Sequence, residues 1–344
     1  MQTSPLIQPD HETEFVTCLL ESAHRTGICV DETAFINFYV ALKSKPMVIL
    51  TGPERSGKIA AVQCLANILL GDCARCQMMM GHPWTFAKSE HLALFTEVHT
   101  RYNTEKLLWQ IEEAWRPENA RKVFIACLTH ISPAELLSFF TEVAFQLRHG
   151  QLMRLGDVHF SEPIPFPPNL FLIGTMDTPN FNWWDRDLLS KTTVVQWPTA
   201  GTLPCPYQNG VVPAWEGEFL RSRVRQKQAV YHKVHSVLKR HPQPLMPLIQ
   251  VEALLREHAI PNLHWLMDEV MLYLANSWSR LDNGLFDPSD PRNLTIALDL
   301  AISQILLPGT ADMLRRLGIL REQLHNLLAG QFPRSAAFVY SFAE

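Results

Sequence analysis

Short apolar runs alternate with helical patterns through the first 200 residues of the chain. Residues 12–28 and 33–43 repeat apolar side chains at helical spacing, which is typical of amphipathic helices. The sequence predicts buried strands at 46–50, 122–127, 169–175 and 193–197, with a helix at 59–70 after the first of them, and Met78–Met80 is interpreted as the end of a buried strand. Apolar strands that alternate with helices predict a mostly parallel sheet covered on both faces.

The pattern changes after residue 200. A stretch rich in Pro and Gly leads to helical patterns at 217–240, 247–258, 262–280, 293–306 and 319–329, and the next strand-like run comes only in the last few residues. The sequence therefore predicts an α/β domain followed by an all-helical domain. The expected units are N-terminal helices over 1–45, the α/β domain over 46–200 and a helical lid over 201–344.

Composition and charge exclude several classes of protein. Apolar residues make up 47% of the chain and charged residues 19%, which excludes a disordered, collagen-like or coiled-coil protein. The formal net charge of −4 does not predict a polyanion binder at the level of the whole molecule. The seven cysteines are irregularly spaced, with one CxxC motif at Cys73 and Cys76, and no apolar run approaches the length of a membrane span. We expect reduced thiols, no metal, no membrane contact and a cytoplasmic location.

The first predicted strand runs into a phosphate-loop pattern. Gly52, Gly57 and Lys58 match G-x4-G-K, in which backbone N–H groups close on phosphate and the Lys reaches the β- and γ-phosphates. The next position, where a Ser or Thr hydroxyl would bind Mg²⁺, is Ile59. The strand at 122–127 should end in acids that hold Mg²⁺ and activate water, but Ile125–His130 contains no carboxylate. Because phosphoryl transfer depends on that charge stabilisation, we do not expect hydrolysis.

In the order of its motifs, the chain resembles the McrB-like branch of the AAA+ NTPases, motors of bacterial restriction and defence systems. The similarity covers roughly residues 33–330. Besides the phosphate loop, it is carried by Ala41–Pro46, His82–Thr85, Pro168–Thr175, Asp268–Val270 with Tyr273, Leu285–Asp287, Asp299–Ala301 and Ile305–Pro308. The resemblance implies a P-loop AAA+-type parallel sheet flanked by helices, followed by an all-helical lid.

The chain departs from the family's pattern where catalysis needs it most. The resemblance places the acidic pair on Cys127 and Leu128, and His130 stands where an Asn usually follows. The sensor position, usually Asn, falls on Asp177. These replacements, together with Ile59, favour the interpretation that the chain has lost catalytic activity.

The arginine-finger position is also altered. The Asp-Arg pair of the family falls on Ser190 and Lys191, and a Lys keeps the charge but loses the planar fork of Arg. Arg186 lies nearby in the sequence and is an alternative source of a guanidinium.

We therefore expect a non-hydrolysing pseudo-ATPase that acts as a structural subunit of a bacterial defence or nucleic-acid-processing complex. Its partners would be AAA+ or nuclease subunits, or further copies of itself. No cofactor is expected, although Lys58 leaves binding of ATP or GTP open. The alternative is an atypical ATP or GTP hydrolase whose site is completed by Asp177, His130 or residues of a partner.

A third hypothesis concerns the helix predicted at 217–240, which carries a basic stripe opposite a row of valines. The stripe consists of Arg221, Arg225, Gln228, His232, His235 and Lys239. It suits DNA, RNA or an acidic protein, or else is the solvated face of an amphipathic helix. Phe181, Trp183 and Trp184 are expected either at a subunit contact or packed beneath the lid.

Overall fold

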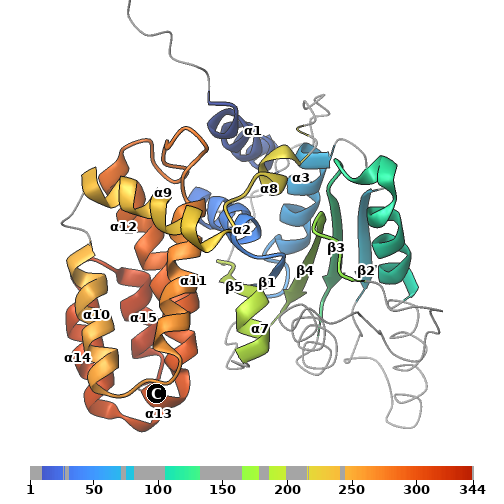
Figure 1. Ribbon diagram of the computed structural model, residues 1–344. Coiled ribbons are helices and arrows are strands. Elements are labelled where there is room, and N and C mark those ends of the chain that lie inside the picture. Colours follow the sequence, from blue (N-terminus) through green and yellow to red (C-terminus); the bar gives the residue numbers. More distant parts are fainter. Residues whose placement is uncertain are drawn as a thin grey trace, which may run out of the picture.

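A computed structural model describes residues 10–25, 27, 31–70, 75–80, 105–131, 165–177, 186–198, 215, 217–240 and 245–342. Five parallel strands form one sheet in the order β2-β3-β4-β1-β5 (Figure 1). The strands are β1 (Met47–Thr51), β2 (Cys76–Met80), β3 (Phe124–Thr129), β4 (Leu170–Met176) and β5 (Thr192–Gln196). The predicted parallel sheet with flanking helices and a helical C-terminal part is confirmed.

The helices fall into two groups. Those next to the sheet are α1 (His11–Arg25), α2 (Glu32–Ser44), α3 (Lys58–Leu70), a helix over 105–115, the short η2 (Pro117–Asn119) and α7 (Arg186–Lys191). The C-terminal part contains α8 (Glu218–Arg221), α9 (Lys227–Arg240), α10 (Leu245–Glu257), α11 (Leu263–Asn276), α12 (Asp290–Ala301), η4 (Ile302–Leu306), η5 (Pro308–Thr310), α13 (Ala311–Arg316), α14 (Gly318–Leu328) and α15 (Pro333–Tyr340). In Figure 1 the helices from α9 onward stand beside the sheet, on the side of β5.

Strand β1 shows how the two faces of the sheet are covered. Successive side chains of a strand point to opposite faces. Val48 and Leu50 pack into a large core with α1, α2 and α3, whereas Met47 and Ile49 pack into a smaller core with the helix over 105–115 and α7. All five positions of β1 are buried, as expected for a parallel sheet with both faces covered.

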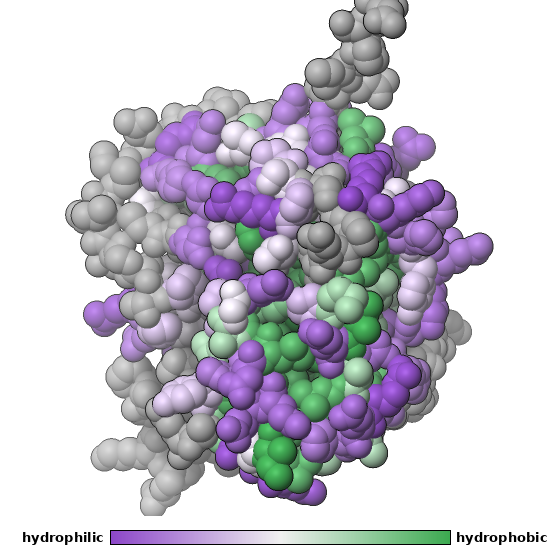
Figure 2. All heavy atoms as spheres, turned by 90° about the vertical axis from the view of Figure 1, so that its left-hand side faces the viewer, coloured by the Kyte–Doolittle hydropathy of each residue, from purple (hydrophilic) through white to green (hydrophobic). Residues whose placement is uncertain are grey.

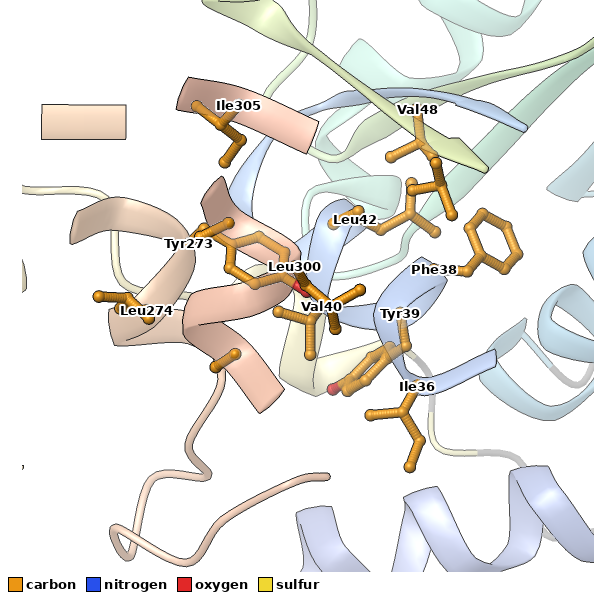
Figure 3. Packing of buried hydrophobic residues seen from close by; sticks show 14 of the residues in the cluster. Ile36, Phe38, Tyr39, Val40, Leu42, Val48, Tyr273, Leu274, Leu300 and Ile305 are labelled. Atoms are coloured by element: carbon orange, nitrogen blue, oxygen red, sulfur yellow. The ribbon is translucent and has the colours of Figure 1, made fainter. Parts of the chain in front are cut away.

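The larger core continues from the sheet into the helical part. Figure 3 shows Leu42 of α2 lying toward Val48 of β1, while Val40 lies toward Leu300 of α12. Helix α2 thus contributes side chains to the sheet layer and to the helical part. One apolar core is shared by the two parts of the chain.

Buried polar groups also join the two parts. The Tyr273 hydroxyl donates to Asn37 Oδ1 at 2.6 Å, and the side-chain amides of Asn37 and Gln304 bind each other. Lys45, at the end of α2, forms a buried ion pair with Glu269 of α11 at 3.0 Å. Because each of these groups finds its partner across the junction, the junction is specified by polar contacts as well as by packing.

The helix predicted at 217–240 is divided in the structure, so that prediction is wrong. Helix α8 ends at Arg221 and α9 begins at Lys227. Between them, the Val224 N–H donates to Asn276 Oδ1 and the Val224 carbonyl accepts from Asn276 Nδ2, each at 3.1 Å. The Asn276 side chain, which belongs to α11, thus makes the hydrogen bonds that the Val224 backbone would have made in a continuous helix.

Two other elements also differ from the prediction. Strand β3 ends two residues later than expected, at Thr129. The strand-like run at the end of the chain is part of helix α15, whose first turn is capped by Asp299: its Oδ1 accepts from Ser335 N at 2.8 Å and its Oδ2 from Arg334 N at 3.1 Å. A cap supplied by a distant helix decided that conformation.

The helical part exposes some apolar side chains on its outer face. Figure 2 views that side and shows apolar side chains gathered between hydrophilic ones. The most exposed on α10 and α14 are Met246, Ile249 and Ile319. Within the described part of the chain, the helical stretch Pro291–Arg316 is long and apolar enough to cross a membrane, but 78% of its apolar window is buried inside the fold, as in the core helix of a soluble protein.

Candidate functional site at the phosphate loop

Parallel pairing brings three chain segments together at the carboxyl edge of the sheet. Thr51 at the end of β1 pairs with Met176 on one side and Gln196 on the other. The residues that follow these strands, Gly52, Asp177 and Trp197, therefore lie at the same edge. Strand β3 joins them, since the His130 N–H donates to the Thr175 hydroxyl at 3.0 Å.

The loop between β1 and α3 is held by Trp197, which the sequence analysis did not single out. The indole N–H of Trp197 donates to the Ser56 carbonyl at 3.0 Å, and its backbone N–H donates to the Thr51 carbonyl at 2.6 Å. A Cβ on Gly52 would lie 2.4 Å from the Trp197 carbonyl oxygen, so this glycine is needed for the close approach. Gly57 adopts φ 84°, a conformation that favours glycine. In the sequence, Trp197 was the last residue of the strand predicted at 193–197, whereas β5 ends one residue earlier, at Gln196.

Lys58, the first residue of α3, points back into its own loop. Its ammonium lies 3.0 Å from the Gly52 carbonyl, 2.5 Å from the Pro53 carbonyl and 3.1 Å from the Ser56 hydroxyl. It also forms an ion pair with Asp177 Oδ1 at 3.0 Å, and its side chain is only 3% exposed. The lysine that would contact phosphate is thus surrounded by acceptors from its own chain.

The two carboxylate oxygens of Asp177 contact different partners. Oδ1 faces Lys58, and Oδ2 lies 2.5 Å from Nδ1 of His130. Partial burial acts to raise the pKa of Asp177, but hydrogen bonds from His130 and Lys58 outweigh it, and the pKa is lowered below its usual value. The structure therefore brings Lys58, His130 and Asp177 together as one cluster, with Asp177 ionised.

The two positions to which the resemblance assigns acids lie inside β3. Cys127 points into the larger core and Leu128 into the smaller one, on opposite faces of the sheet. Burial raises the pKa of the Cys127 thiol well above its usual value, so this thiol stays protonated. The end of the strand carries Thr129 and His130, and Ile59 supplies no hydroxyl at the loop.

The two positions to which the resemblance assigns the arginine finger lie at the opposite edge of the sheet. Ser190 and Lys191 end α7 directly before Thr192, and Thr192 pairs with Met47 at the start of β1. The length of β1 therefore separates them from the phosphate loop of the same chain, about 15 Å at the rise of an extended strand. Arg186 begins α7, and its side chain lies outside the described residues.

The basic stripe is divided between three segments. Arg221 lies on α8, and Arg225, in the link to α9, donates from Nη2 to the Pro168 carbonyl at 3.1 Å. The remaining members are exposed on α9: Gln228, His232, His235 and Lys239. Other basic residues of α9 pair with acids, Lys227 with Asp268 at 2.6 Å and Lys233 with Asp282 at 3.5 Å. Because the members lie on two helices and the link between them, the stripe is not the single helical line that the sequence predicted.

Several predicted features lie outside the described residues. These are Phe181, Trp183, Trp184, Cys73 and the segment His82–Thr85. Among the residues that the structure does describe, no group of three or more His, Cys, Asp or Glu side chains is placed to hold a metal ion. No protein-family model matches the chain, and no curated protein sequence matches it.

Proposed function

We propose that this chain is a pseudo-ATPase of the AAA+ type that acts as a structural subunit of a larger assembly. The observation that carries the proposal is the chemistry at the carboxyl edge of the sheet. A phosphate-loop pattern lies there, but Ile59 replaces the metal-binding hydroxyl, and β3 ends at Thr129 and is followed by His130. Asp177, the acid found beside the loop, is bound to Lys58 and His130.

This chemistry is insufficient for phosphoryl transfer. That reaction needs a divalent cation to neutralise charge on the phosphates and a carboxylate or amide to position the attacking water. Within the described part of the chain, position 59 offers no hydroxyl and β3 offers no acid to hold Mg²⁺ against a nucleotide. The fold around the loop is nevertheless intact, which supports a structural role.

Assembly with a partner rests on the resemblance, because Ser190 and Lys191 give it no support. Ser190 is buried, Lys191 is partly buried, and both lie at the sheet edge away from their own phosphate loop. The resemblance to McrB-like proteins suggests AAA+ or nuclease subunits of a bacterial defence or nucleic-acid-processing complex as that partner.

Native mass spectrometry of the full chain, with and without ATP and Mg²⁺, tests the proposal. We expect no conversion of ATP to ADP, and an oligomeric state that ATP does not alter. A nucleotide-loaded ring that turns ATP into ADP contradicts it. A steady-state phosphate-release assay on the same sample gives an independent measure of turnover.

One observation favours an atypical hydrolase as the second candidate. The His130 ring is 46% exposed at the phosphate loop, and its Nδ1 is held by Asp177, so Nε2 is available as a general base. If phosphate release is detected, His130→Gln should abolish it, because the amide cannot accept the proton from water. Turnover that survives this substitution excludes His130 as the base.

A further inference from the structure

We infer that Asp177 is a built-in counter-anion that takes the place of a nucleotide phosphate at Lys58 and thereby keeps nucleotides out of the loop. This inference rests on the proposed function, because it concerns the same phosphate loop. It explains how the loop can persist as a folded element without its ligand. It also identifies the residue that decides whether nucleotide binds.

The Lys58 ammonium already has more acceptors around it than it has N–H groups to donate. An ammonium group has three N–H donors. Four acceptors surround it within 3.1 Å, namely the carbonyls of Gly52 and Pro53, the Ser56 hydroxyl and the Asp177 carboxylate. A phosphate oxygen can reach the ammonium only by displacing one of them, and the carboxylate is the one acceptor that carries a full negative charge.

The Asp177 carboxylate is held in a fixed position beside Lys58. Asp177 follows directly after β4, whose last residue, Met176, pairs with Thr51 and accepts a hydrogen bond from the Gly52 N–H at 3.3 Å. Its second oxygen is held by His130. The backbone at the end of β4 and the contact with His130 therefore both fix the position of the carboxylate.

The negative charge of Asp177 opposes the binding of a phosphate at Lys58. A nucleotide phosphate at Lys58 would lie beside the Asp177 carboxylate, and like charges at contact distance repel strongly where solvent is partly excluded. In a working site Mg²⁺ reduces such repulsion, but this loop has Ile59 where the metal ligand would be. The repulsion is therefore not relieved, and the internal ion pair is the favoured state.

The substitution Asp177→Asn tests the inference, because the amide keeps the shape and removes the charge. We expect ATP or ADP affinity, measured by titration calorimetry, to rise by at least about tenfold over the wild-type chain. Asp177→Glu is the matched control that keeps the charge, and it should show no gain. Glu54→Gln removes a loop carboxylate that is 69% exposed and pairs with Arg55, and it should leave the affinity unchanged.

The double variant Lys58→Met with Asp177→Asn should lose the gained affinity, which assigns that affinity to the loop. Tight ATP binding by the unaltered chain, with a dissociation constant far below about 1 mM, contradicts the inference without any variant. An equal affinity for Asp177→Asn and the wild type also contradicts it. In both cases the proposed function stands as long as no ADP forms, whereas ADP production contradicts the proposed function itself.

Discussion

Lys58 and Asp177 stabilise each other at a place where water has little access to solvate either charge. The ammonium is buried, and the carboxylate is only 28% exposed. A buried cation without its anion carries an uncompensated desolvation cost, and the reverse holds for the anion. The same contact that keeps phosphate out therefore also contributes to folding.

Removal of the lysine should destabilise the chain. We expect Lys58→Met to lower the free energy of unfolding by about 1–3 kcal/mol, because Asp177 loses its main cationic partner. The double variant with Asp177→Asn should recover part of that loss. Urea unfolding followed by circular dichroism gives both values, and strictly additive effects would show that the two side chains do not interact.

The pH dependence of stability should report on Asp177. Its pKa is lowered in the folded state, so its contribution is fully present above the unfolded value of about 3.9 and is lost as pH falls through the folded pKa. We expect the difference in unfolding free energy between wild type and Asp177→Asn to shrink from about pH 5 to pH 2.5. A difference that stays constant over this range would contradict the role assigned to its charge.

At the scale of elements, the break between α8 and α9 depends on one buried side chain. Asn276 is fully buried, and its amide holds both backbone groups of Val224 as well as the Leu272 carbonyl. We expect Asn276→Ala to cost about 2–4 kcal/mol, because several buried polar groups lose their partner. Hydrogen exchange should show loss of protection at residues 222–226 in particular. Unchanged protection there would mean that packing alone holds the link.

The exposed face of α9 should tolerate changes of charge. His235 and Lys239 are exposed, so His235→Glu with Lys239→Glu should change the unfolding free energy by less than about 0.5 kcal/mol. The same variant provides the test of polyanion binding. Retention of single-stranded DNA by the wild type and its loss in this variant would identify α9 as a nucleic-acid surface, whereas no retention by either chain identifies a solvated face.

At the scale of the whole molecule, α1 is tied to α2 and to the helical part by a buried ion pair. Glu12 lies 2.5 Å from the Lys43 ammonium and accepts from the Tyr39 hydroxyl at 2.9 Å, while Lys43 also donates to the Trp278 carbonyl at 3.2 Å. Sheet, N-terminal helices and helical part therefore share both an apolar core and buried polar contacts.

Because of this continuity, the described elements should unfold as one unit. We expect a single urea transition with coincident circular dichroism and tryptophan fluorescence curves. Glu12→Ala should shift both curves together, with a loss of about 3–5 kcal/mol, because Lys43 keeps a buried charge without its partner. Two separate transitions would show that the sheet and the helical part are independent.

Much of the fold was predictable because its signals are local. Strand β1 and helix α3 follow from an apolar run, a Gly-containing turn and helical periodicity within 25 residues of sequence. The positions of Gly52 and Gly57 in the loop between them, and of Lys58 where the helix begins, follow from the same segment. The replacement of the hydroxyl by Ile59 and the lack of acids on β3 are likewise visible in the sequence itself.

The tertiary structure alone decided what these residues contact. The Lys58–Asp177 pair depends on β1 lying next to β4, and no local pattern specifies that pairing. Trp197 reaches the loop only because β5 lies on the other side of β1. Asn276 divides a helix that periodicity predicted as continuous.

The sequence by itself determined the strands, most of the helices and the identity of the residues at the loop, because periodicity, turn residues and residue identity are properties of short segments. Only the tertiary structure decided that Lys58 pairs with Asp177, that Ser190 and Lys191 lie at the sheet edge away from the loop, and that one core joins the sheet to the helical part. Those outcomes arise from strand order and from side chains that meet across long stretches of chain.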